Sequence, residues 1–299
     1  MATLITIVGP TAIGKTALSI QLANHFNTEI ISCDSRQFYK EMSIGTAVPE
    51  DHELAAATHH FIQDRSINED YNVGQFEKDA LKKLSELFIQ HDVVIMVGGS
   101  GLYIDAVLKG LDYFPEVDAK IRETLNTKLQ EFGIAHLQKQ LKELDPISYS
   151  EIAIDNPHRL IRALEICIST GQPYAAYKNK PKDPRPFNSI KIGLHADRDI
   201  IYNRINKRVD IMMQMGLLDE VKRLLPNKSL NALQTVGYKE LFLYLENQTT
   251  LEEAISEIKK NTRRFAKRQL TWFRKDLSTL WFDYVTDVND IIKKIDTKI

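Results

Sequence analysis

The residues that decide the fold class lie at the start of the chain: Leu4-Ile5-Thr6-Ile7-Val8, followed by Gly9-Pro10-Thr11-Ala12-Ile13-Gly14-Lys15-Thr16. The first five predict a short apolar strand, and the next eight match the pattern G-x-x-x-x-G-K-[ST]. Residues 17–23 then have a helical pattern. Backbone N–H groups of such a loop surround phosphate oxygens, and the helix N-terminus adds the positive end of its dipole. We therefore expect a phosphate site rather than a turn that only joins a strand to a helix.

The residues after this loop alternate between strand and helix patterns. Apolar strands are predicted at residues 29–32, 93–97, 189–194 and 280–282, and residues 74–90 have the apolar spacing of an amphipathic helix. Continuous apolar strands joined by helices are typical of a parallel sheet covered on both faces. We therefore expect an α/β fold: a P-loop-containing parallel-sheet core with helices on both faces.

Residues 115–186 differ in character, because they are predicted to be entirely helical. The candidate helices lie near 118–131, 134–144 and 157–170. The last begins with Asn156 as N-cap and Pro157 at the first helical position, and it ends at Gly171. We expect a core formed by residues 1–114 and 187–299, interrupted by a helical insertion at 115–186. Further core helices are predicted at 200–215, 217–225, 237–246 and 251–275.

Composition and charge limit the classes of protein. The chain has 299 residues and a net charge of −1, and no apolar run approaches the roughly 20 residues that a membrane span needs. Residues 1–8 lack the basic flank of a signal peptide. The two cysteines, Cys33 and Cys167, have no metal-binding spacing and predict free thiols. We therefore expect a cytoplasmic protein without membrane association. We also expect a monomer that needs no obligate protein partner.

Cationic residues are unevenly distributed. Residues 259–275 contain no acid and carry the cations Lys259, Lys260, Arg263, Arg264, Lys267, Arg268, Arg274 and Lys275, which we call the basic stripe. Such a stripe suits a polyanionic ligand. It is equally compatible with a solvated helix face that is balanced by acids brought close in the fold.

Asp34 is a candidate functional carboxylate. It follows the second predicted strand, and since the carboxyl ends of parallel strands face the same crevice, we expect it near the phosphate loop. There it could accept a proton from a nucleophile or help to hold a metal, and a turn or N-cap role is the alternative. The strand at 93–97 ends in Gly98-Gly99 rather than in the Mg²⁺-binding acid of motors and GTPases. A small-molecule kinase would fit these features but would leave the insertion and the basic stripe unexplained.

Eight blocks of the sequence resemble the tRNA dimethylallyltransferase family, in family order and over nearly the whole chain. Besides the phosphate loop they are Asp34-Ser35-Arg36-Gln37-Phe38-Tyr39, Ile44-Gly45-Thr46-Ala47, His59-His60-Phe61, Gly98-Gly99-Ser100-Gly101-Leu102-Tyr103, Asn156-Pro157-His158-Arg159 with Arg162-Ala163-Leu164-Glu165, Gln234-Thr235-Val236-Gly237-Tyr238-Lys239-Glu240, and Ala266-Lys267-Arg268-Gln269 with Thr271-Trp272-Phe273-Arg274. Together these blocks are far more specific than the phosphate loop alone.

The resemblance implies transfer of a dimethylallyl group from dimethylallyl diphosphate to an adenine of tRNA. The acceptor would be the exocyclic amine of the adenine immediately 3′ of the anticodon, in tRNAs that read codons beginning with U. Asp34 would accept the proton of the amine, with Lys15 and Thr16 as further catalytic groups. The phosphate loop would hold the diphosphate as it leaves, through Gly9, Pro10, Thr11, Ala12, Ile13, Gly14, Lys15 and Thr16. Arg208 would bind the same diphosphate, and Mg²⁺ would be the cofactor, held by Thr16.

The same resemblance implies a set of contacts to the anticodon stem-loop of tRNA. The residues concerned are Asp34, Ser35, Arg36, Gln37, Ser100, Arg122, His158, Arg159, Leu160, Ile161 and Arg162. The target base must leave its stack to react, and the basic stripe would bind backbone phosphates, so affinity should fall steeply with salt. We expect His59 and His60 to be structural, because adjacent side chains point apart.

Two positions depart from the family pattern, and alternatives remain open. Ser43 stands where an acid is common and Val48 where a lysine is frequent, which concerns local tRNA or loop contacts rather than the activity. The alternatives are an adenine-nucleotide prenyltransferase, a P-loop kinase of small molecules, and an RNA-binding protein with a vestigial loop.

Overall fold

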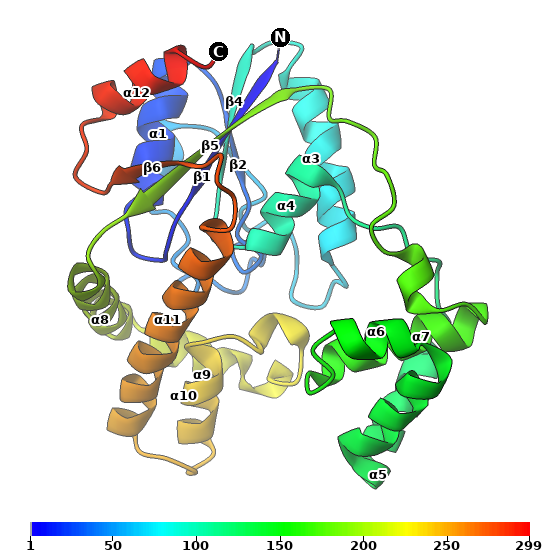
Figure 1. The fold of residues 1–299 in the computed structure, drawn as a ribbon. Helices are drawn as coiled ribbons and strands as arrows, with labels where there is room; N and C mark the ends of the chain where they lie inside the picture. Colours follow the sequence, from blue (N-terminus) through cyan, green and yellow to red (C-terminus); the bar gives the residue numbers. More distant parts are fainter. Residues whose placement is uncertain (1) are drawn as a thin grey trace. The chain divides into compact units, whose positions relative to one another are not determined.

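The computed structural model describes residues 2–299, and the chain forms two compact units (Figure 1). The first consists of Met1–Lys109 and Arg185–Ile299, and the second consists of Gly110–Pro184. The expected insertion at 115–186 thus overlaps the second unit, which begins and ends slightly earlier in the chain. The structure describes no helix that is long and apolar enough to cross a membrane within residues 2–299.

The first unit is built on a six-stranded sheet in the order β3-β2-β4-β1-β5-β6, and every pairing is parallel. The strands are β1 (Thr3–Val8), β2 (Ile30–Ser32), β3 (His59–His60), β4 (Val93–Val97), β5 (Asn188–His195) and β6 (Leu280–Asp283). This confirms the predicted parallel sheet. Strand β3 was not predicted, because two residues are too few to give an apolar pattern.

Helices cover both faces of this sheet (Figure 1). Along β1 successive side chains alternate, so that Ile5 and Ile7 pack with α1 (Lys15–His25) and α12 (Val288–Asp296). Leu4 and Val8 pack on the other face, with α3 (Val73–Leu87) and α4 (Gly101–Lys109). The prediction of helices on both faces is confirmed, although α12 itself was not predicted.

A third apolar cluster joins four further helices of the first unit. These are α8 (Arg198–Gln214), α9 (Leu217–Leu224), α10 (Tyr238–Leu245) and α11 (Leu251–Phe273), with short 3₁₀ turns η2 (Leu225–Asn227) and η3 (Asn231–Leu233). The short helix α2 (Asp51–Ala56) has no buried residue and lies outside this cluster. In the cluster, Val209 of α8 and Ile258 of α11 pack with Leu217 and Leu241. Helix α11 begins with a capping box between Thr250 and Glu253.

The second unit is helical and has its own core. It contains α5 (Ala119–Leu144), α6 (Pro146–Glu151), α7 (Pro157–Thr170) and η1 (Tyr174–Tyr177). The two helices predicted at 118–131 and 134–144 are confirmed, because the backbone of α5 is non-helical at Gly133, whose φ is +75°. The ends of α7 are as predicted, since the Asn156 side chain accepts hydrogen bonds from two backbone N–H groups and Gly171 has a left-handed φ of +67°.

Candidate active site

The phosphate loop connects β1 to α1 and depends on two glycines. Gly14 precedes α1 with φ +110°, a left-handed conformation that L side chains rarely adopt. Gly9 has φ +147°, and a Cβ there would lie 2.7 Å from the Leu194 carbonyl oxygen. No side chain caps α1, which leaves its first N–H groups available to an anion.

Lys15 and two arginines place positive charge around this loop. The Lys15 ammonium donates a hydrogen bond to the Pro10 carbonyl at 2.9 Å. Burial lowers the pKa of Lys15 to about 8, with Asp34 opposing the shift and Arg208 adding to it. Arg208 donates to the Thr11 hydroxyl at 3.4 Å, and Arg204 donates to the Ala12 carbonyl at 2.7 Å. Neither of the nearby acids Asp210 and Glu220 pairs with Arg208 among the described residues, because Asp210 pairs with Lys259 and Glu220 accepts from the Gly45 N–H.

Asp34 lies at the end of β2, and the glycines after β4 bring it close to the loop. A Cβ on Gly98 would lie 2.1 Å from the Cys33 carbonyl oxygen, so the backbones approach too closely there for any side chain. This explains why β4 does not end in an acid. Burial raises the pKa of Asp34, against the hydrogen bond from the Arg36 N–H (3.1 Å) and the positive charges of Lys15, Arg36 and Arg208.

These groups line one cavity of about 970 Å³. One part of its wall is polar and cationic, formed by the loop from Thr11 to Thr16, Asp34 and Arg208. Another part is apolar and contains Ile44, Val48, Ile211, Met212 and Met215. The cavity can therefore hold a ligand that combines an anionic group with a small apolar group.

The donor groups in the cavity also fit a magnesium ion. Thr16 and Asp34 supply one hydroxyl and one carboxylate, and Mg²⁺ is commonly held by one or two protein oxygens together with phosphate oxygens and water. Residues 2–299 contain no cluster of three or more acids, histidines or cysteines that would suit a metal held by protein alone.

Ser35, Arg36 and Gln37 are fixed by contacts within the protein. The Ser35 N–H donates to the Ser100 hydroxyl at 3.0 Å, which joins the segment after β2 to the segment after β4. The Arg36 guanidinium donates to the carbonyls of Asn231 and Ala232, at 3.0 Å each. The Gln37 amide donates to the carbonyls of residues 46 and 47.

Glu220 is a buried carboxylate that sequence reasoning missed. Its two oxygens accept hydrogen bonds from the backbone N–H groups of Ser43, Ile44 and Gly45, at 2.8–3.0 Å, and from the Tyr238 hydroxyl at 2.6 Å. A Cβ on Gly45 would lie 2.5 Å from the Tyr238 ring. The blocks around Gly45 and Tyr238 are thus one structural unit, which holds a wall of the cavity.

Residues 37–276 of the sequence match the IPP transferase family. The chain belongs to this family. It is 62% identical over 296 residues to the tRNA dimethylallyltransferase of Christiangramia forsetii, covering 99% of this chain and 98% of that protein. The corresponding protein of Flavobacterium johnsoniae is 60% identical over 301 residues, with coverages of 99% and 97%.

Solved structures of family members have a similar fold. The full-length tRNA isopentenylpyrophosphate transferase of Bacillus halodurans is 38% identical, with a TM-score of 0.73 and coverage of 99% of this chain and 95% of that chain. A eukaryotic dimethylallyltransferase, solved in a study of its action on tRNA, is 27% identical with a TM-score of 0.79. The match covers 97% of this chain and 75% of that chain.

In this member of the IPP transferase family, the residues of α7 that the resemblance assigns to tRNA binding differ in their exposure. His158 and Arg159 are exposed. Leu160 and Ile161 are 0% and 5% exposed and belong to the apolar core of this unit. These two side chains therefore pack inside the second unit rather than at its surface, and the expected contact of positions 160 and 161 with tRNA stays a prediction.

Two arginines of the second unit share one buried acid. Arg122 donates to both oxygens of Glu165, at 2.7 and 2.9 Å, and Arg162 also donates to Glu165. The Arg162 guanidinium lies 5.2 Å from the centre of the Phe114 ring. Both arginines are partly exposed, so this network fixes two cationic groups at the surface.

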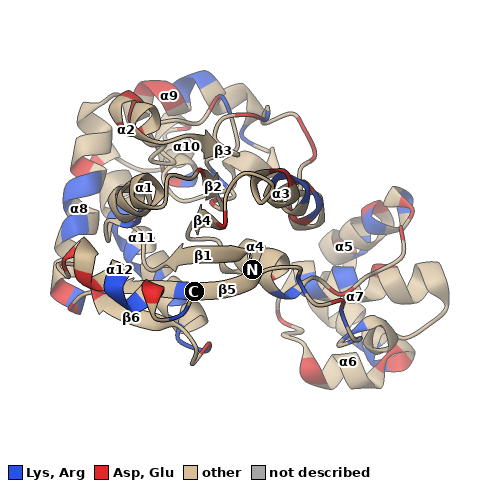
Figure 2. Ribbon diagram, turned by 90° about the horizontal axis from the view of Figure 1, so that it is seen from above, with Lys and Arg blue, Asp and Glu red and all other residues tan. Residues whose placement is uncertain are grey.

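The basic stripe lies largely on α11, and only part of it is neutralised. Lys259 pairs with Asp210, and Lys260 pairs with Glu257. Figure 2 shows cationic bands on both α8 and α11. A hollow of about 910 Å³ is lined by residues of these two helices, which are Arg198, Asp199, Tyr202, Asn203, Asn206, Lys260, Arg263, Arg264 and Lys267. The balance of acids and cations is therefore strongly positive along this hollow.

The histidine pair and the cysteines have structural settings. His59 bonds through Nδ1 to the Ala57 carbonyl at 2.8 Å, whereas His60 bonds through Nε2 to Glu29 at 2.6 Å. The two histidines thus have different partners, as expected. Cys33 and Cys167 are buried free thiols.

Proposed function

We propose that this protein transfers a dimethylallyl group from dimethylallyl diphosphate to tRNA. The acceptor is the exocyclic amine of the adenine immediately 3′ of the anticodon, in tRNAs that read codons beginning with U. The observation that carries the proposal is the shared cavity, in which a cationic phosphate loop, the carboxylate of Asp34 and an apolar wall lie together. The names of the relatives, which match over almost the full chain, support the same activity.

The chemistry needs a stabilised leaving group. The bond between the allylic carbon and the diphosphate oxygen breaks, the carbon binds the adenine nitrogen, and the diphosphate leaves with more negative charge. The free N–H groups at the start of α1, together with Lys15 and Arg208, are placed to stabilise that charge. Thr16 would hold Mg²⁺, which supplies further neutralisation of the diphosphate.

Asp34 accepts the proton that the amine loses as the new bond forms. The amine is a weak nucleophile because its lone pair is delocalised into the adenine ring. Burial raises the pKa of Asp34 and makes its carboxylate a stronger base than an exposed aspartate. A positioned general base contributes about 10²–10⁴-fold to a rate.

Cationic side chains bind the tRNA. Candidates in the second unit are the exposed His158 and Arg159 and the ordered Arg122 and Arg162. In the first unit the cations of the basic stripe bind backbone phosphates, and Arg36 lies beside the proposed base. The buried free thiols suit a reducing compartment such as the cytoplasm.

Labelled dimethylallyl diphosphate tests this function. It is incubated separately with total tRNA, AMP and ATP. We expect label only in the tRNA, at the adenine 3′ of the anticodon. Label in AMP or ATP would instead identify an adenine-nucleotide prenyltransferase. Turnover of ATP with a small acceptor would identify a kinase.

A further inference from the structure

Gln269 of α11 forms two hydrogen bonds that no role described so far requires. Its side chain is buried, at 5% exposure. The Thr11 N–H of the phosphate loop donates to Gln269 Oε1 at 2.9 Å, and Gln269 Nε2 donates to the Gly99 carbonyl at 3.0 Å. One amide group thus links the phosphate loop to the segment that follows β4.

The fit around this amide is close. A Cβ on Gly99 would lie 2.3 Å from Gln269 Nε2 and 3.8 Å from an oxygen of Asp34. Gly99 is therefore small because the amide occupies that space, and the amide lies near the proposed base. The next residue, Ser100, accepts the hydrogen bond from the Ser35 N–H. Through Gln269 and Ser100, the phosphate loop is thus connected to the segment that carries Asp34.

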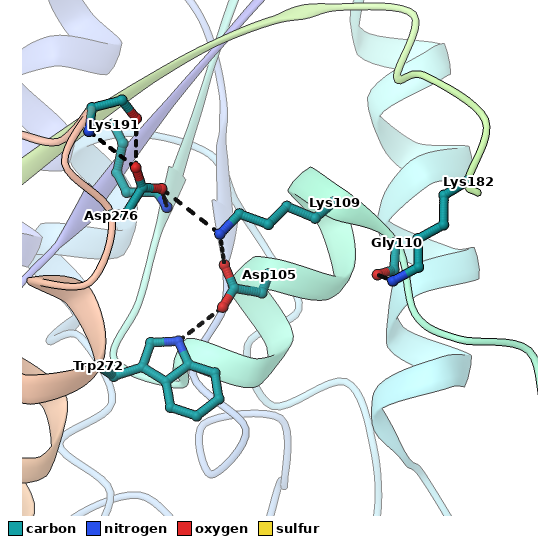
Figure 3. A network of polar contacts seen from close by, with 8 residues as sticks. Asp105, Lys109, Gly110, Lys182, Lys191, Trp272 and Asp276 are labelled. Carbon is teal, nitrogen blue, oxygen red and sulfur yellow. Dashed lines mark hydrogen bonds and ion pairs between the residues drawn. The ribbon is translucent and has the colours of Figure 1, made fainter. Parts of the chain in front are cut away.

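The end of α11 that carries Gln269 is itself firmly attached (Figure 3). Trp272 Nε1 donates to Asp105 of α4 at 2.9 Å, and Asp105 pairs with Lys109 at 3.1 Å. Asp276, just after α11, pairs with Lys191 of β5 at 2.6 Å. Lys109 joins both acids, since its ammonium also lies 3.8 Å from Asp276. The C-terminal end of α11, which carries Gln269, is therefore anchored to α4 and β5.

We propose that Gln269 is a positioning residue that holds the phosphate loop in register with Asp34, an inference that rests on the proposed function. Because the Thr11 N–H is used by Gln269, the diphosphate is bound by the later N–H groups of the loop. The hydrogen bond between Thr11 and Gln269 fixes the position of those N–H groups. It thereby fixes the position of the allylic carbon relative to the adenine nitrogen that Asp34 deprotonates. Displacements of about 1 Å in such an arrangement cost as much as 100-fold in rate.

Two variants separate positioning from packing. Gln269→Met keeps the length and volume of the side chain but forms neither hydrogen bond. Gln269→Glu keeps an acceptor for the Thr11 N–H but offers no donor to Gly99. Gln248→Met is the matched control, because it makes the same chemical change at an exposed site. Each folded variant is measured for single-turnover prenyl transfer, KM for dimethylallyl diphosphate, affinity for tRNA and hydrogen exchange of the Thr11 amide.

We expect both Gln269 variants to lose about 10–100-fold in the transfer rate, with a raised KM for the donor and unchanged tRNA affinity. The Thr11 amide should exchange faster in Gln269→Met, and the control should match the wild type. A transfer rate within twofold of the wild type in either folded variant would overturn the proposal, as would a loss confined to tRNA affinity. If the wild-type protein transfers no prenyl group to tRNA, the proposed function fails. The exchange of the Thr11 amide and the affinity for inorganic pyrophosphate then still test the link made by Gln269.

Discussion

At the scale of single residues, Asp34 and Lys15 share a cavity in which burial favours the neutral form of each. It raises the pKa of Asp34 and lowers that of Lys15 to about 8. Ionised groups in such a site destabilise the protein while the site is free of ligand. Bound substrates stabilise the ionised forms by supplying opposite charge and hydrogen bonds. The free site is thus prepared for an anion beside Lys15 and a proton donor beside Asp34.

Replacing Asp34 tests the role of the base. We expect Asp34→Asn to retain tRNA affinity and to lose about 10²–10⁴-fold in single-turnover transfer. Its melting temperature should exceed that of the wild type at neutral pH. Because the native pKa of Asp34 lies above its unfolded value, the native state holds the proton longer, and its stability falls as pH rises through that window. Transfer at a near-normal rate by Asp34→Asn would contradict the assignment.

Lys15 predicts a pH dependence of donor binding. In the free protein its folded pKa is lowered to about 8, so the ammonium is present below that pH and is lost above it. Binding of a diphosphate then requires uptake of a proton, and KM for the donor should rise by up to about tenfold per pH unit above pH 8. Steady-state kinetics from about pH 7 to 9.5 measure this. Lys15→Arg stays charged throughout, so its KM should be flat, and a flat profile in the wild type would refute the prediction.

Some of these residues could be found from the sequence and others could not. Asp34 follows a predicted parallel strand, so a topological rule placed it near the loop. Glu220 and Gln269 act on groups 175 and 258 positions away in the chain. No local pattern reports such contacts. For Gln269 the only signal was that it and Thr11 both lie in family blocks, whereas Glu220 lies outside every block.

At the scale of secondary structure, the patterns predicted the long elements and missed the short ones. Strands β1 and β4 are continuous apolar runs, and α7 has an N-cap and a C-terminal glycine that define its ends. Helix α2 and strand β3 are too short to show a periodic pattern. Leu160 and Ile161 lie in the core of the second unit although they stand between exposed or partly exposed members of the same family block, because a helix turns its residues toward different sides.

The loop of residues 43–47 gives a prediction at this scale. Glu220 accepts three backbone N–H groups and one hydroxyl, so in Glu220→Gln an amide NH₂ would face donors instead of accepting from them. We expect the free energy of unfolding to fall by about 1–3 kcal/mol in urea denaturation, with a raised KM for the donor. Asp219→Asn, at the neighbouring position, is the control. Unchanged stability in Glu220→Gln would show that the loop does not depend on this carboxylate.

At the scale of the whole molecule, the net charge of −1 conceals a strongly uneven distribution. Cations outnumber acids on α8 and α11, whereas α9 and α12 carry both signs (Figure 2). A near-neutral protein of this kind can bind a polyanion locally without attracting it over its entire surface. The binding should therefore depend on salt through a small number of phosphate contacts.

Removing two cations of the stripe tests this. We expect Arg264→Gln with Lys267→Gln to weaken tRNA binding and to reduce the slope of log K against log salt by up to about 2. The rate of single-turnover transfer at saturating tRNA should not change. Lys293→Gln with Lys294→Gln on α12 changes the net charge equally and should leave the slope unchanged. Equal effects of the two double variants would mean that only overall charge matters.

A crystal structure with a non-hydrolysable thio analogue of dimethylallyl diphosphate tests the proposed chemistry most directly. We expect the diphosphate against the loop from Gly9 to Thr16, in contact with Lys15 and Arg208, and the allylic carbon facing Asp34. A diphosphate bound elsewhere, or an allylic carbon shielded from Asp34, would contradict it.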